Sequence, residues 1–96
     1  MNDKELYLQK IEAEINEWKA QIDLFKAKSI SATADVKVSI NHNIKIFEEK
    51  IEEGKAKLVE LSKSTESTFE SMKKTFETKW NIIKTAIADT TKKLNA

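Results

Sequence analysis

The only histidine in the chain, His42, is the first candidate for catalysis or metal binding. A histidine on a helix shares such work with side chains three or four residues away, because those positions lie on the same helix face. Here they hold Ser39 and Lys45, then Val38 and Ile46, which supply neither a carboxylate nor a second imidazole. We therefore predict that His42 is a surface residue.

A cluster of carboxylates is the second candidate, and it comprises Glu48, Glu49, Glu52 and Glu53. Carboxylates on consecutive helical turns can bind a divalent cation or share acid–base work. Di-metal carboxylate bundles also carry a Glu-x-x-His motif on an inward face, and this motif does not occur here. We predict a solvated helix face, on which Glu53 pairs with Lys57, and a second pair formed by Glu70 and Lys74.

The composition excludes several function classes. The chain has no cysteine, so it has no thiol nucleophile, zinc–thiolate site or disulfide. Its 17 basic residues are all lysines and face 16 acids, which leaves a net charge of +1 and no arginine fork for phosphate or base edges. We predict a protein that is not an enzyme, with no catalytic, cofactor-binding or metal-binding residues and no nucleic-acid partner.

The elements that would position these side chains are helices. The chain contains no proline and one glycine, Gly54, and no apolar run exceeds three residues, far short of a membrane span. Its start shows neither the basic nor the apolar region of a signal peptide, so we expect a cytoplasmic protein.

An apolar stripe recurs at spacings of three and four residues along almost the whole chain. The spacing alternates between a seven-residue and an eleven-residue period, which predicts an all-α coiled coil with little supercoil. Both tryptophans fall on the stripe, so we assign them to packing. The predicted core and self-association residues are Ile11, Ile15, Trp18, Ile22, Phe25, Ile40, Ile44, Phe47, Ile51, Gly54, Leu58, Phe69, Met72, Phe76, Trp80, Ile83 and Ile87.

A turn is predicted at about residues 63–66, because Ser67 and Glu70 form a capping box in front of a helix over about 67–95. Residues folded antiparallel across this turn should pair with index sums of 130 or 131. The sum places Phe47 opposite Ile83 and the only glycine, Gly54, opposite Phe76, as dense packing of small against large requires.

Residues 29–35 are rich in serine and threonine and leave two folds open. If the helix runs unbroken over about 3–62, two long antiparallel hairpins cross as a homodimer, and each cross-section contains three helices. If the chain turns there, it folds as a monomeric up-down-up three-helix bundle, with Val36 on the apolar seam in both folds. We favour the continuous helix, because the segment has no glycine or proline and no capping glutamate or glutamine. Either way residues 1–96 form one domain.

The last predicted helix is amphipathic and basic, with an apolar face bordered by Lys73, Lys74, Lys79, Lys84, Lys92 and Lys93. Such a helix can lie in a membrane interface if it leaves its partners. Reversible binding to lipid or another hydrophobic surface is therefore the alternative to our main hypothesis, a non-enzymatic structural module that binds itself and an unidentified protein partner.

Several segments resemble small bacterial coiled-coil stress-response proteins. They are Tyr7, the run from Glu17 to Asp23, the run from Ile51 to Leu58, and the aromatic-rich stretch from Phe69 to Trp80. The chain departs from that family in having Phe69 where a tryptophan is usual, and serine and threonine at 29–35 where an alanine- and charge-rich run is usual. The resemblance implies a non-enzymatic cytoplasmic protein linked to stress, and it carries over no catalytic residues.

Overall fold

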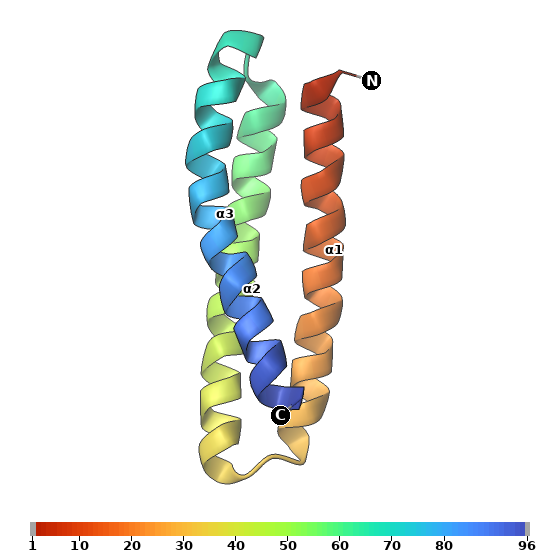
Figure 1. The fold of residues 1–96 in the computed structure, drawn as a ribbon, viewed down its shortest axis with the longest axis vertical. Coiled ribbons are helices and arrows are strands. Elements are labelled where there is room, and N and C mark those ends of the chain that lie inside the picture. The colour runs from red at the N-terminus through yellow and green to blue at the C-terminus, as the bar shows by residue number, and fades with distance from the viewer. Residues whose placement is uncertain (1, 96) are drawn as a thin grey trace.

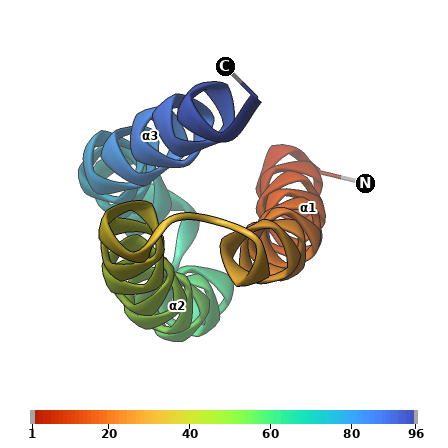
Figure 2. The ribbon, with the colours of Figure 1, turned by 90° about the horizontal axis from the view of Figure 1, so that it is seen from below.

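The computed structural model describes residues 2–95, and these form three helices packed side by side. They are α1 (Asp3–Ile30), α2 (Ala34–Lys63) and α3 (Glu66–Asn95), running up, down and up in a bundle of about 50 × 21 × 19 Å. Figure 1 shows the three helices lying along one another, and Figure 2 shows them arranged at the corners of a triangle. The all-α prediction is confirmed.

The favoured continuous helix is wrong for this structure, because α1 ends at Ile30 and α2 begins at Ala34. Hydroxyl groups compete with the helix backbone close to the break. The Ser29 Oγ donates to the Lys26 carbonyl at 3.0 Å, and the Ser31 Oγ donates to the Lys28 carbonyl at 3.4 Å. Such bonds offer the backbone an alternative to helical pairing and weaken the last turn. The bundle follows the up-down-up alternative within one chain.

The second connection falls close to its predicted place but is capped by a different residue. Helix α3 begins at Glu66, so Ser67 lies inside it and is not the cap. Thr65 precedes the helix: its Oγ1 accepts from the Thr68 backbone N–H at 3.4 Å, and its carbonyl accepts from the Phe69 N–H at 2.9 Å. Both Ser67 and Thr65 are N-cap types, and the helix begins one residue before its predicted start at about residue 67.

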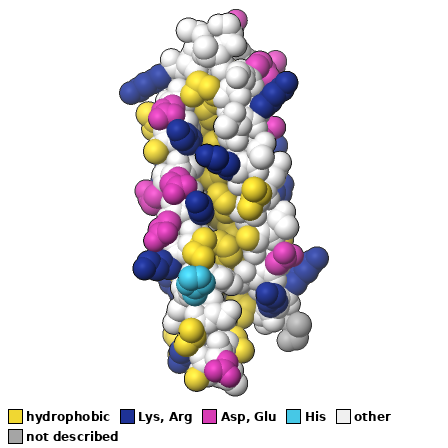
Figure 3. Space-filling model, turned by 90° about the vertical axis from the view of Figure 1, so that its left-hand side faces the viewer, with side chains coloured by type: hydrophobic (Ala, Val, Ile, Leu, Met, Phe, Trp, Pro, Cys, Tyr) yellow, Lys and Arg dark blue, Asp and Glu magenta, His cyan; other side chains and the backbone are white. Residues whose placement is uncertain are grey.

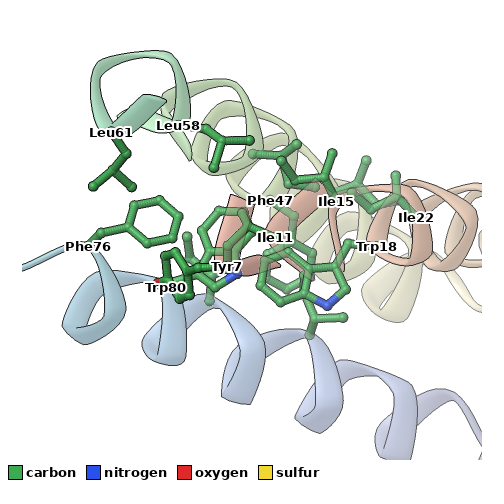
Figure 4. Packing of buried hydrophobic residues seen from close by; sticks show 14 of the residues in the cluster. Tyr7, Ile11, Ile15, Trp18, Ile22, Phe47, Leu58, Leu61, Phe76 and Trp80 are labelled. Atoms are coloured by element: carbon green, nitrogen blue, oxygen red, sulfur yellow. The ribbon is translucent and has the colours of Figure 1, made fainter. Parts of the chain in front are cut away.

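The core lies on the axis of the triangle and is almost wholly apolar. Every predicted core residue is buried except Met72, which is half-buried and packs against the cluster. Figure 4 shows side chains from all three helices meeting there. One seam residue was assigned wrongly: Val36 is 44% exposed, because the chain has only just left the loop and α1 does not cover it.

The predicted partner of Gly54 is also wrong, since Trp80 and not Phe76 covers it. A Cβ built on Gly54 would overlap Cζ3 of Trp80 and lie 2.9 Å from its Cη2. Side chains on a helix lean toward its N-terminus, so the long indole can reach one layer beyond its own backbone position. Phe76 instead stacks on the Trp80 ring at a centroid distance of 5.0 Å.

Candidate interaction surface: the seat of the first helix

The candidate interaction surface is the face of α2 and α3 against which α1 lies, called here the α1 seat. Helix α1 packs more extensively against α2 than against α3. Six of its seven buried residues are apolar or aromatic, so burial of apolar area is its principal attachment. The seven are Tyr7, Ile11, Ile15, Trp18, Ile22, Phe25 and Ser29.

An aromatic cluster fills one part of the α1 seat. The Tyr7 ring meets Phe69 and Phe76 edge-on at 5.9 and 6.4 Å, and Trp18 lies 4.4 Å from Trp80 between centroids. These rings are drawn together in Figure 4, where Tyr7, Phe76 and Trp80 are labelled. Such edge-on and offset contacts add to the burial of the rings and fix their orientation.

Tyr7 is a core residue that the sequence prediction missed. The pattern did contain a signal, because Tyr7, Ile11 and Ile15 are spaced by four residues and so share one helix face. The neighbouring Leu8 also fits the stripe, because it lies three residues before Ile11. In the structure Tyr7 is buried, and Leu8 is partly buried at its flank.

Polar groups from three residues surround this aromatic cluster. The Trp80 indole N–H donates to the Glu14 carboxylate at 2.8 Å, as expected for an indole that reaches the bundle edge. The Lys73 amine lies 4.8 Å from the centroid of the Tyr7 ring, within cation–π range. Burial, and then the neighbouring Glu77 carboxylate, raise the pKa of the Tyr7 phenol well above its usual value. The phenol therefore stays protonated at neutral pH.

Helix α1 makes one polar contact to the turn between the other two helices, but two of its buried polar atoms have no hydrogen bond to a described residue. The Lys4 amine donates to the Ser64 carbonyl at 2.6 Å and ties the start of α1 to the turn between α2 and α3. In contrast, the Tyr7 hydroxyl and Gln21 Oε1 are buried and make no hydrogen bond of standard geometry to a described residue, although the Glu77 carboxylate lies close enough to the phenol to raise its pKa. A buried polar atom left unpaired costs about 1–3 kcal/mol. Both of these unpaired atoms belong to α1.

The residues first considered for chemistry lie on the outside. His42 and all four clustered glutamates are exposed. Among residues 2–95 no three acidic or histidine side chains come together as a metal site would require. The predicted Glu53–Lys57 pair is wrong, because each residue pairs three positions away instead: Glu53 with Lys50 at 3.4 Å and Lys57 with Glu60 at 3.2 Å. Exposed pairs of this kind stabilise a fold very little.

A shallow hollow lies on the outside of the bundle where α1 meets α2. Both lysines and acids line it, and an ion pair between Lys26 and Glu48 at 3.6 Å closes one part. Charges of both signs cancel one another over a few ångströms, so this hollow does not select an ion of either sign.

Hydrophobic side chains also reach the surface on the side where α2 and α3 lie, as Figure 3 shows. The exposed large ones on these two helices include Ile46, Val59 and Ile82. On this face hydrophobic side chains stand among basic and acidic ones, so the surface is mixed in character. Over residues 2–95, no helix combines the length and apolar character that crossing a bilayer demands.

Comparisons with known proteins do not identify a relative: no family model, no curated protein and no solved structure matches the chain. The resemblance to bacterial stress-response proteins therefore stays a prediction.

Proposed function

We propose that this chain is a non-enzymatic interaction module that binds amphipathic helices, with the hairpin of α2 and α3 as the receptor and α1 as the helix it holds. The observation that carries the proposal is the α1 seat. It accepts a 28-residue helix through apolar layers along its length, and the bound helix keeps two unpaired buried polar atoms. Recognition of an amphipathic helix in an apolar groove is a common mode of protein interaction.

The chemistry of the α1 seat supports binding in preference to catalysis. Its walls are aliphatic and aromatic; of the two carboxylates at its edge, Glu14 is engaged by the Trp80 indole and Glu77 lies beside the Tyr7 phenol. General acid–base or nucleophilic work requires a titratable group aimed at a substrate and oriented by a second group. The Tyr7 phenol is buried and held protonated, which makes it a packing group.

A peptide-uptake experiment tests the proposal. In the full chain, Trp18→Ala and Phe25→Ala weaken the resident helix while leaving the walls of the α1 seat intact. A fluorescently tagged peptide covering residues 3–30 should then bind with saturable anisotropy and restore helical circular dichroism. The matched control peptide carries Ile15→Asp and Ile22→Asp and should not bind, because it would place two charges in the core.

Two results of this experiment would overturn the proposal. If the weakened chain stays folded and ignores the wild-type peptide, the α1 seat does not accept helices in trans and the proposal fails. If the weakened chain unfolds, the wild-type peptide should refold it, and absence of any gain in helicity also overturns the proposal.

A second candidate function is reversible binding to a lipid surface through α3. The structure gives this helix a continuous buried apolar face from Phe69 to Ile87, with its six lysines outnumbering four acids. Release of α3 from the bundle would present this face to an anionic membrane. Anionic vesicles should then co-float with the protein and shift its tryptophan emission to the blue. Absence of both effects removes this candidate.

A further inference from the structure

The connection between α1 and α2 is built as a hinge that needs little change to become helix. It has three residues, Ser31 to Thr33, and contains neither glycine nor proline. No described residue has a positive φ, so no left-handed turn holds the chain in its reversal. Ser31 (φ −98°, ψ 5°) lies at the edge of the helical region, whereas Thr33 (φ −64°, ψ 161°) has a helical φ and departs through ψ.

The start of α2 at this hinge is weakly capped. Thr33 is the N-cap residue, but its side chain makes no capping hydrogen bond, although its carbonyl accepts from the Lys37 N–H at 2.8 Å. At the comparable position in front of α3, Thr65 does bond through its hydroxyl. The helix start after residue 33 therefore lacks the side-chain capping hydrogen bond that stabilises the helix start after residue 65.

The apolar stripe keeps its phase across the hinge. Phe25 and Val36 are 11 residues apart in the sequence, and 11 residues are close to three complete helical turns. A hairpin loop places no demand on this phase, since the two helices it joins are separate. In a straight helix, however, the core face of α1 would pass through Ala32 and Val36 directly into Ile40. Val36, 44% exposed in the bundle, would then belong to a continuous apolar face.

We propose that the hinge at residues 31–33 straightens and that α1 then occupies the α1 seat of a second copy of this chain, which returns its own α1 in exchange. This inference rests on the proposed function, because the α1 seat must accept a helix in trans. Every contact of α1 in the bundle is re-formed between the two copies. The two straightened hinges cross antiparallel, so Val36 of each copy is brought beside the Ser29 region of its partner.

The closed monomer and the exchanged dimer contain the same core contacts. The free-energy difference between them therefore depends mainly on the hinge. Holding α1 on the same chain gives it an effective concentration near millimolar. The exchanged dimer forms at a lower protein concentration only if the straight hinge has a lower free energy than the bent hinge. Helix propensity at residues 31–33 should therefore set the dissociation constant of the dimer.

Two hinge variants make opposite predictions. Ser31→Ala with Thr33→Ala removes both hydroxyls, favours helix, and should lower the dimer dissociation constant roughly tenfold or more. Ala34→Pro fits the bundle, because residue 34 is the first position of α2 and Thr33 before it is already extended. The same proline in a straight helix would clash with the carbonyl of Ile30, so this variant should remain a monomer.

Sedimentation equilibrium from low micromolar to near-millimolar concentration is the measurement. The wild-type mass should rise from 11.0 kDa toward twice that value, the alanine pair should complete the rise at lower concentration, and Ala34→Pro should stay at 11.0 kDa throughout. A wild-type chain that is monomeric over the whole range, or a proline variant that dimerises like wild type, overturns the inference. Successful peptide uptake alongside a monomeric wild type would remove only this inference and leave the proposed function standing.

Cross-linking distinguishes exchange from simple side-by-side association. The chain has no cysteine, so single cysteines can be placed at Lys4 and Ser64, which are joined by a hydrogen bond across the bundle. A chain with Lys4→Cys is mixed with one carrying Ser64→Cys, and a short bis-maleimide is added. Exchange predicts a covalent heterodimer, which Ala34→Pro in both chains abolishes. A dimer that forms without this cross-link overturns the exchange.

Discussion

Replacing Gly54 by alanine tests the packing between α2 and α3 most directly. The added methyl group would meet the Trp80 ring, overlapping Cζ3 and lying 2.9 Å from Cη2 and 3.2 Å from Cε3. The ring is not free to move aside. It stacks on Phe76 at 5.0 Å, lies 4.4 Å from Trp18, and its N–H is bound to Glu14 at 2.8 Å.

Two opposing effects set the magnitude. Alanine is favoured over glycine by about 1 kcal/mol within a helix. Overpacking a dense core costs about 1–3 kcal/mol, and loss of the hydrogen bond to the Glu14 carboxylate would add about 1.5–3 kcal/mol. We therefore expect Gly54→Ala to destabilise the fold by about 2 kcal/mol net, which lowers the melting temperature by about 10 °C in a domain of this size.

Urea and thermal unfolding followed by circular dichroism measure this change. The matched control is Ala56→Gly, an exposed position on the same helix, which should cost about 1 kcal/mol and so reports the helix propensity alone. Trp80→Phe removes the larger ring, and in that background Gly54→Ala should become neutral or stabilising. If Gly54→Ala stabilises the wild-type chain by as much as Ala56→Gly destabilises it, the indole does not lie on Gly54 and the assigned packing is refuted.

Two further predictions concern the core. Tyr7 is the only tyrosine, so its absorbance should show no phenolate until the pH is above its usual pKa near 10. Because the unfolded phenol ionises first, the stability present below about pH 10 should fall as the pH rises further. Tyr7→Phe should abolish that fall and raise the free energy of unfolding by about 1 kcal/mol at neutral pH. If the phenol of the folded protein ionises at its ordinary pKa, Tyr7 is not buried. Phe47→Ala and Ile83→Ala should each cost about 3 kcal/mol or more in urea unfolding, and a melting point within a degree of wild type would exclude either residue from the core.

The helices and most of their buried faces were predictable because they depend on a sum over many residues. Spacings of three and four place a whole stripe on one side of a helix, and one misassigned residue, such as Val36, does not alter the stripe. The assignment of Trp18 and Trp80 to packing followed in the same way, since both fall on it. Partners within the core were less predictable, because the partner of Gly54 depends on how far one indole leans along α3.

The break between α1 and α2 was not predictable from propensity, because it depends on a few hydrogen bonds. Serine and threonine are only moderately poor helix formers, so a rule based on glycine and proline favours an unbroken helix. In the bundle the Ser29 and Ser31 hydroxyls bond to carbonyls three residues earlier, and these bonds compete with helical pairing where the chain reverses. The free energies of such bonds are each about 1 kcal/mol or less.

The two connections of the bundle therefore have different consequences for function. The turn from α2 to α3 is held by the Thr65 cap and by the bond from Lys4 to Ser64, and the layer behind it is fitted around Gly54 and Trp80. The loop from α1 to α2 has an N-cap without a side-chain bond, and it leads to the helix that carries both unpaired buried polar atoms. Because this loop is the less firmly capped of the two, α1 is the helix that we expect to exchange between copies of the α1 seat.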